Sequence, residues 1–126
     1  MRFLHYKDLI VWQKAMELTT EIYRLTKKLP KDELYALTNQ LRRAAVSISS
    51  NIAEGNARFS TKEYLRFLSI ARGSTAEVET QILICLKLNY LSQEDIASAV
   101  SLLDETGRML NSMIKKLRDK ESATED

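Results

Sequence analysis

The chain has 126 residues, a length typical of a single domain that buries a core of its own. With 44% hydrophobic residues, 29% charged residues, three glycines and one proline, its composition is typical of a helical globular protein. The formal net charge of +2 does not indicate nucleic-acid binding by itself, so any such argument must rest on local clusters of basic residues.

The cysteine content and the lengths of the hydrophobic stretches indicate in which cellular compartment the protein is expected. The lone Cys85 excludes an internal disulfide framework and fits a reducing cytoplasm. Charged residues interrupt the N-terminal sequence MRFLHYKD, where a signal peptide needs a continuous apolar stretch. No later stretch stays apolar over the roughly 18 residues that a membrane span requires. We therefore expect a cytoplasmic protein that makes no membrane contact.

The first predicted helix covers residues 8–28. Its apolar residues alternate spacings of four and three, the pattern of a helix packed along one seam: Val11, Ala15, Leu18, Ile22, Leu25 and Leu29. Asp8 is the expected N-terminal cap. Pro30 ends the helix because it disfavours helical dihedral angles in the preceding residue.

The second predicted helix covers residues 32–54. Acidic Asp32 and Glu33 favour a helix N-terminus at this point. The expected core seam consists of Leu34, Leu37, Leu41, Ala44 or Ala45, Ile48 and Ile52. Gly55 follows as the residue expected to leave the helix in a left-handed conformation.

The third predicted helix covers residues 61–89, with Ser60 and Glu63 forming a capping box at its start. Its seam is Leu68, Ala71, Thr75, Val78, Ile82 and Cys85. Gly73 lies in the middle of this helix, where a glycine indicates close approach of another backbone or side chain.

The fourth predicted helix covers residues 93–118, and Ser92 with Asp95 repeats the capping pattern more weakly. Its seam is Ile96, Val100, Leu103, Gly107, Leu110, Ile114 and Leu117. Residues 119–126 are polar, and we expect this tail to be disordered. Four such helices joined by short loops predict one all-α domain over residues 1–126, an antiparallel up-down-up-down four-helix bundle. The seam spacing predicts left-handed crossings.

The second helix carries a row of small and polar residues beside its apolar seam. A plain structural helix does not need such a row, and we predict that it contacts a partner together with residues of the third helix. The predicted interaction or oligomer face is Gln40, Arg43, Ser47, Asn51, Glu54, Arg72, Gly73, Ser74 and Glu77. Arg43 and Glu54 are too far apart to pair with each other, so each needs another partner. We consider three roles for this face. Contact between helices or subunits is the first alternative, binding of a partner is the second, and a solvated surface is the third.

Several motifs resemble one family over nearly the whole chain. They are LIVWQKA at residues 9–15, QLRRAAVSI at 40–48, SNIAEG at 50–55 and ARGS at 71–74, followed by Glu77 and Glu79. The chain resembles the four-helix-bundle proteins encoded within intervening sequences of bacterial 23S ribosomal RNA genes, also labelled S23 ribosomal proteins. The resemblance implies a ring-like homopentamer. It also extends to the accessory variability determinant of diversity-generating retroelements, a strongly basic relative that works with a reverse transcriptase and nucleic acid.

Because this chain is only weakly basic, we expect nucleic-acid contacts only where basic residues cluster. The predicted contacts with RNA or DNA are Arg58, Lys62, Arg66, Lys115, Lys116 and Arg118. In an up-down-up-down arrangement these residues share one end of the bundle. The alternative is that lysines near a helix C-terminus complement the helix dipole.

Catalytic residues are not evident in the sequence. His5 is the single histidine and lies near the N-terminus, while Cys85 falls on an apolar seam as an inert thiol. No Glu-x-x-His motif and no glycine-rich phosphate loop are present. We expect a non-enzyme with no cofactor, no metal and no small-molecule substrate. Its expected partners are copies of itself and RNA or DNA, and a protein adaptor without nucleic-acid binding is the alternative.

Overall fold

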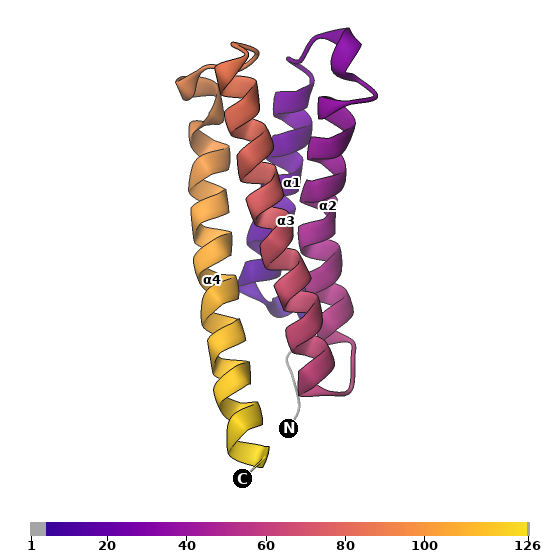
Figure 1. Ribbon diagram of the computed structural model, residues 1–126, viewed down its shortest axis with the longest axis vertical. Coiled ribbons are helices and arrows are strands. Elements are labelled where there is room, and N and C mark those ends of the chain that lie inside the picture. Colours follow the sequence, from indigo (N-terminus) through magenta and orange to yellow (C-terminus); the bar gives the residue numbers. More distant parts are fainter. Residues whose placement is uncertain (1–4, 126) are drawn as a thin grey trace.

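The structure is a computed structural model that describes residues 5–125, and it is all-α, with four helices packed against each other (Figure 1). A 3-10 turn η1 (Tyr6–Asp8) precedes α1 (Ile10–Thr26), and a second 3-10 turn η2 (Lys31–Glu33) precedes α2 (Leu37–Asn56). The helices α3 (Thr61–Lys87) and α4 (Gln93–Glu125) complete the chain.

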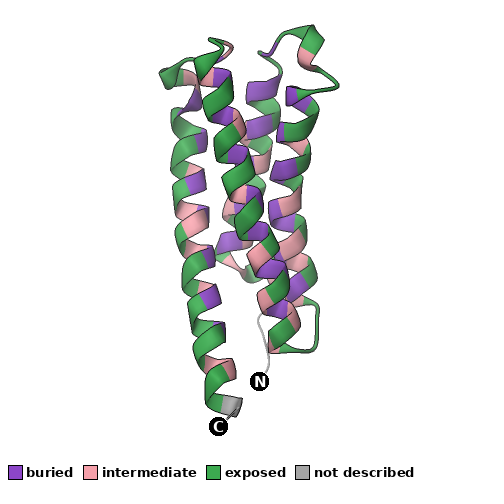
Figure 2. Cartoon of the chain, viewed as in Figure 1, coloured by how far each residue is buried: buried purple, intermediate pink, exposed green. Residues whose placement is uncertain are grey.

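Each helix packs against two others. Helix α1 contacts α2 and α4, and α3 contacts the same two helices from the other side. Figure 1 shows the α1–α2 and α3–α4 connections at one end of the molecule, and the α2–α3 connection at the end where α4 finishes. Buried positions lie on the sides of the helices that face one another (Figure 2). Within the part of the chain that the structure describes, no helix is both long and apolar enough to cross a membrane.

Helix α1 follows its predicted seam, since all six predicted seam residues are buried. Its start differs from the prediction, because Asp8 lies in η1 and the N-cap is Leu9, whose side chain makes no capping bond. Two ion pairs connect this part of the chain to α4: Lys14 Nζ of α1 lies 3.4 Å from Glu105 Oε2, and Lys28 Nζ, in the turn after α1, lies 2.8 Å from Asp95 Oδ1.

Helix α2 begins five residues later than residue 32, at Leu37. Residues 31–33 form η2 instead, and the Ala36 backbone (φ −121°, ψ −105°) separates the two elements. Glu33 Oε1 accepts a hydrogen bond from the Leu37 backbone N–H, which provides a remote cap. Leu34 is therefore 47% exposed and not part of the seam.

The predicted C-cap role of Gly55 is wrong. Gly55 remains helical, no glycine among the described residues has a positive φ, and α2 continues to Asn56. Positive φ occurs instead at Asn89 (60°), just after α3 ends at Lys87, where the chain reverses towards α4.

Helices α3 and α4 begin with side-chain caps. Ser60 Oγ accepts from the Glu63 backbone N–H at 3.1 Å as predicted, while the Glu63 carboxylate accepts from Arg66. The α4 cap is reciprocal, because Ser92 Oγ accepts from the Asp95 N–H at 3.1 Å and Asp95 Oδ2 accepts from the Ser92 N–H at 2.9 Å. The cap expected to be weaker therefore satisfies two backbone donors.

The seam of α4 differs from the predicted one at two positions. Val100 is 41% exposed and Gly107 is half-buried, whereas Ala99 and Thr106 are fully buried. The helix also passes the predicted boundary at residue 118 and continues to Glu125, with Asp126 outside the described residues. No glycine or proline follows Gly107, and a Lys115–Asp119 pair at 3.3 Å spans the predicted boundary, so local sequence supports the longer helix.

Candidate functional site

Helices α2 and α3 approach closely because Gly55 has no side chain. A Cβ atom at this position would lie 2.8 Å from the Phe67 Cβ, 3.1 Å from Tyr64 Cδ1 and 3.4 Å from the Tyr64 carbonyl oxygen. Gly73 does not serve this purpose as predicted, since a Cβ atom there would meet nothing within 4 Å. The close-approach glycine is on α2, and Gly73 faces open space.

The small polar residues of the predicted face connect α2 to α3. Ser47 Oγ and Ser74 Oγ lie 2.9 Å apart, and Ser74 is buried. Asn51 Nδ2 donates to both the backbone oxygen of Ser47 (2.8 Å) and its hydroxyl (2.9 Å). Part of the predicted interaction face is therefore an internal polar network.

Next to this network lies a groove between α2 and α3 with a volume of about 330 Å³. We call it the α2/α3 groove, and it is lined by Asn39, Gln40, Arg43, Ala44, Ser47, Glu77 and Gln81. Gln81 Nε2 donates to Gln40 Oε1 at 3.4 Å, while Gln81 Oε1 is buried and accepts no hydrogen bond from the described residues. Neither Arg43 nor Glu77 forms an ion pair within the described chain.

Two residues of the predicted face lie elsewhere or are already paired. Glu54 does not need a separate partner, because its Oε1 accepts from Arg58 Nη2 at 2.7 Å one helical turn away. Arg72 faces α4, where its Nη1 lies 3.4 Å from Asn111 Oδ1. The predicted face is therefore divided between two sides of α3, since residues 72 and 74 of a helix point in different directions.

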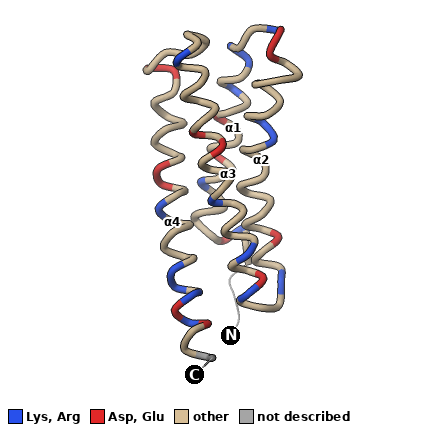
Figure 3. The backbone as a smooth tube through the Cα atoms, in the orientation of Figure 1, with Lys and Arg blue, Asp and Glu red and all other residues tan. Residues whose placement is uncertain are grey.

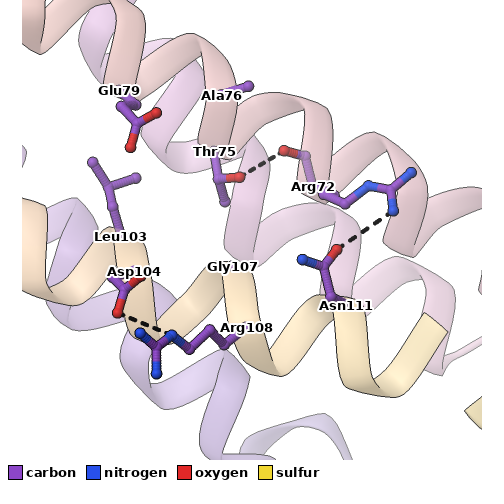
Figure 4. Close-up of a pocket in the computed structure, with 9 residues that line it drawn as sticks. All are labelled: Arg72, Thr75, Ala76, Glu79, Leu103, Asp104, Gly107, Arg108 and Asn111. Carbon is purple, nitrogen blue, oxygen red and sulfur yellow. Dashed lines mark hydrogen bonds and ion pairs between the residues drawn. The ribbon is translucent and has the colours of Figure 1, made fainter. Parts of the chain in front are cut away.

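The α3/α4 side has a groove of its own, with a volume of about 300 Å³ (Figure 4). Figure 4 shows Arg72 and Thr75 on α3 opposite Asp104, Arg108 and Asn111 on α4, with Gly107 between them. Thr75 Oγ1 donates to the Arg72 carbonyl at 2.6 Å, and Arg108 Nε lies 3.1 Å from Asp104 Oδ2. Asp104 and Arg108 of this groove are thus already paired with each other, and Arg72 is bound to a neutral amide.

The predicted nucleic-acid residues gather at the end where α2 turns into α3 and where α4 finishes. Figure 3 shows Lys and Arg at both places, with Asp and Glu between them. The guanidinium carbons of Arg58 and Arg66 lie 4.9 and 4.5 Å from the centre of the Phe67 ring. Each also pairs with a carboxylate, Arg58 with Glu54 and Arg66 with Glu63. These ion pairs and ring contacts fix the two arginines and reduce their local positive charge.

The remaining basic residues at this end differ in their pairing. Lys115 pairs with Asp119 at 3.3 Å, whereas Lys62, Lys116 and Arg118 form no ion pair within the described chain. We call Arg58, Lys62, Lys115, Lys116 and Arg118 the basic end of the molecule.

Phe59 is a residue to which the sequence argument assigned no role. It lies in the α2–α3 turn with a relative exposure of 106%, higher than that of any other large hydrophobic residue described. Its position in the sequence offered a clue: it is an apolar residue between Arg58 and the capping Ser60, and it lies on no helical seam. Tyr35, 91% exposed, lies between η2 and α2 in the α1–α2 connection, which is at the opposite end of the molecule (Figure 1).

Burial and hydrogen-bonded pairing explain the perturbed pKa values of two ionisable groups, Cys85 and Asp95. Burial, with a smaller contribution from the Glu33 charge, raises the pKa of the Cys85 thiol to about 11. A hydrogen bond from Lys28, followed by one from the Ser92 backbone, lowers the pKa of Asp95 to about 2. Within the described residues, no group of three His, Cys, Asp or Glu side chains could hold a metal ion.

Comparisons with known proteins give a family match and a structural match. The family model described as 23S rRNA-intervening sequence protein matches residues 7–112. A crystal structure from Bacteroides thetaiotaomicron, described as a protein of unknown function from the S23 ribosomal protein family, matches with a TM-score of 0.78 and 26% sequence identity. The match covers 84% of this chain and 99% of that chain. Among curated proteins no match was found.

Proposed function

We propose that this chain, which belongs to the 23S rRNA-intervening sequence protein family, is a non-catalytic cytoplasmic protein that assembles with copies of itself along the α2/α3 groove. The proposal depends on two charged residues of this groove that form no ion pair within the described chain, Arg43 and Glu77, both of which are exposed.

The shape of the groove supports the same partner. Gly73 faces open space beside the groove on α3, so another helix backbone can approach there without meeting a side chain. Arg43 and Glu77 carry opposite charges, so the groove can pair with a surface that offers both signs. Identical chains supply such surfaces in closed symmetric assemblies. We extend the proposal to a homopentamer, which the family resemblance implies, of up-down-up-down bundles with the left-handed crossings that the seam spacing predicts.

The mass of the assembly at micromolar concentration tests the proposal, by sedimentation or light scattering before and after nuclease treatment. We expect an oligomer whose protein mass survives nuclease. R43E should lower this mass with unchanged helicity, because the substitution puts a second acidic group beside Glu77. K31E, which reverses the charge of an exposed lysine of η2 outside the groove, is the matched control and should leave the mass unchanged.

A stable monomer of the unmodified chain would refute self-association. If R43E and N51A instead abolish capture of a different protein by a chain that is monomeric throughout, the face serves an adaptor.

RNA binding is a second candidate function, favoured by the clustering of the basic end. Lys62, Lys116 and Arg118 form no ion pair within the described chain, so their charges are available for phosphates. The family descriptions, which name 23S rRNA and a ribosomal protein family, favour RNA over DNA. Binding through phosphates predicts a steep loss of affinity with added salt. Negligible binding at low salt would remove this second function.

A further inference from the structure

The α2–α3 turn combines a fully exposed aromatic ring with polar and basic neighbours. Phe59 is 106% exposed, and its neighbours along the turn, residues 56–62, are otherwise polar or small: NAR and STK. A surface that docks onto protein or lipid normally presents several apolar side chains together. A single aromatic ring with adjacent cations instead matches a nucleic-acid base followed by its phosphates.

The base of this turn is held in place. Gly55 lets Phe67 lie directly against α2, and the Phe67 ring then lies within 5 Å of the guanidinium carbons of both Arg58 and Arg66. Arg58 is bound a second time by Glu54. Since Arg58 immediately precedes Phe59, these contacts restrict the backbone from which the exposed ring projects. The Ser60 cap restricts it on the other side.

Cations without ion-pair partners among the described residues lie at the same end of the molecule as Phe59. Lys62 follows Phe59 by three residues and forms no ion pair within the described chain. The end of α4, with Lys116 and Arg118, lies at the same end of the molecule (Figure 3). The aromatic ring and the charges are thus available to the same ligand.

We propose that this end of the molecule binds single-stranded RNA, with an unpaired base stacked on Phe59 and neighbouring phosphates bound by Lys62. The inference rests on the proposed RNA-binding function and specifies its ligand. Stacking requires a base whose face is free, and bases inside a duplex already stack on their neighbours. The turn therefore selects single strands or loops over continuous duplex.

Fluorescence anisotropy with a labelled RNA of about 12 nucleotides, used single-stranded and as a blunt duplex, tests the proposal. We expect the single strand to bind more tightly. F59A should weaken single-strand binding roughly 5- to 150-fold and leave duplex binding unchanged, whereas F59W should retain the affinity. Y35A is the matched control, because it removes the other highly exposed aromatic ring at the opposite end, and it should change neither affinity. K62A should weaken binding to both forms and reduce the salt slope by about one.

The outcomes separate this inference from the function on which it rests. Absence of binding to either RNA at low salt refutes the RNA-binding function and the inference together. Salt-sensitive binding that is equal for both forms and unaffected by F59A overturns the stacking inference alone. If F59A lowers the mass of the assembly along with the RNA affinity, Phe59 is an intersubunit contact and the inference is also overturned. Circular dichroism of each variant confirms that helicity is preserved.

Discussion

Replacing Gly55 by alanine should destabilise the protein, although the same substitution stabilises most helices. A methyl group at this position would lie 2.8 Å from the Phe67 Cβ and 3.1 Å from Tyr64 Cδ1. The nearest atom is a Cβ, which every residue except glycine has, so no change of the Phe67 rotamer relieves the contact. Helices α2 and α3 must therefore separate.

The magnitude follows from two opposing contributions. Alanine in place of glycine inside a helix gains about 1 kcal/mol. Because Gly55 is in the last turn of α2, the gain in stability from alanine at this position should be smaller. Overpacking a close contact costs about 1–3 kcal/mol. We expect a net loss of about 1 kcal/mol, which for a chain of this length lowers Tm by about 3–5 °C.

Gly107 provides the matched control. A Cβ atom there meets nothing within 4 Å, and the residue lies in the middle of α4, so G107A should gain about 1 kcal/mol and raise Tm. Thermal and urea unfolding of both variants at one protein concentration measures the difference, since assembly makes Tm depend on concentration. If G55A raises Tm as much as G107A does, the inference that α2 and α3 pack closely at Gly55 is wrong.

Two further predictions concern ionisable groups. Because the pKa of Asp95 is lowered to about 2, below its ordinary value of about 3.9, its contribution to stability is present above pH 4 and is lost as the pH falls towards 2. Unfolding of D95N should therefore depend less on pH in that window than unfolding of the unmodified chain, and equal pH dependence would contradict the Lys28 and Ser92 contacts. Because Cys85 is fully buried and its thiol pKa is raised to about 11, a thiol reagent at pH 8 should react far more slowly with the folded chain than with the chain in urea. Equal reaction rates would show that the end of α3 is open in the folded state.

The helices were predictable because apolar spacing is a strong and local property. All predicted seam residues of α1 are buried, as are Leu41, Ile48 and Ile52 of α2. The fourth seam was predicted with a strict heptad-like spacing, which placed Val100 in the core. The structure buries Ala99 and Thr106 instead. Both seams run from Ile96 to Leu117 in steps of three and four residues, so the helical period does not distinguish them, and the prediction took the larger apolar Val100 in place of the small Ala99 beside it.

The roles of the glycines and of Leu34 were not predictable from local sequence. Whether a glycine ends a helix or admits a neighbour depends on what packs against it, and at Gly55 that neighbour is Phe67, twelve residues later. Leu34 continues the apolar spacing of α2, but η2 and the turn at Ala36 precede the helix and leave Leu34 exposed.

The candidate site was predictable only in part. The small polar residues of α2 were predicted to contact a partner, and in the structure Ser47 of this row forms a hydrogen bond with Ser74 of α3. The sequence could not show which polar groups remain available, because Glu54 is paired locally and Arg72 turns towards α4. Arg43 and Glu77 form no ion pair within the described chain, and their contact with a second copy is a prediction.

Two helix contacts of this molecule should respond differently to salt: the α1–α4 contact, which includes ion pairs, and the α2–α3 contact, which depends on close packing. The α1–α4 contact includes the exposed pairs Lys14–Glu105 and Lys28–Asp95, which salt screens. The α2–α3 contact depends on the space left by Gly55, which salt does not affect. Added salt should therefore accelerate amide hydrogen exchange in α1 and α4 before it does so in α2 and α3. We therefore expect the amides of α2 and α3, which include the helices on both sides of the proposed binding turn, to exchange most slowly.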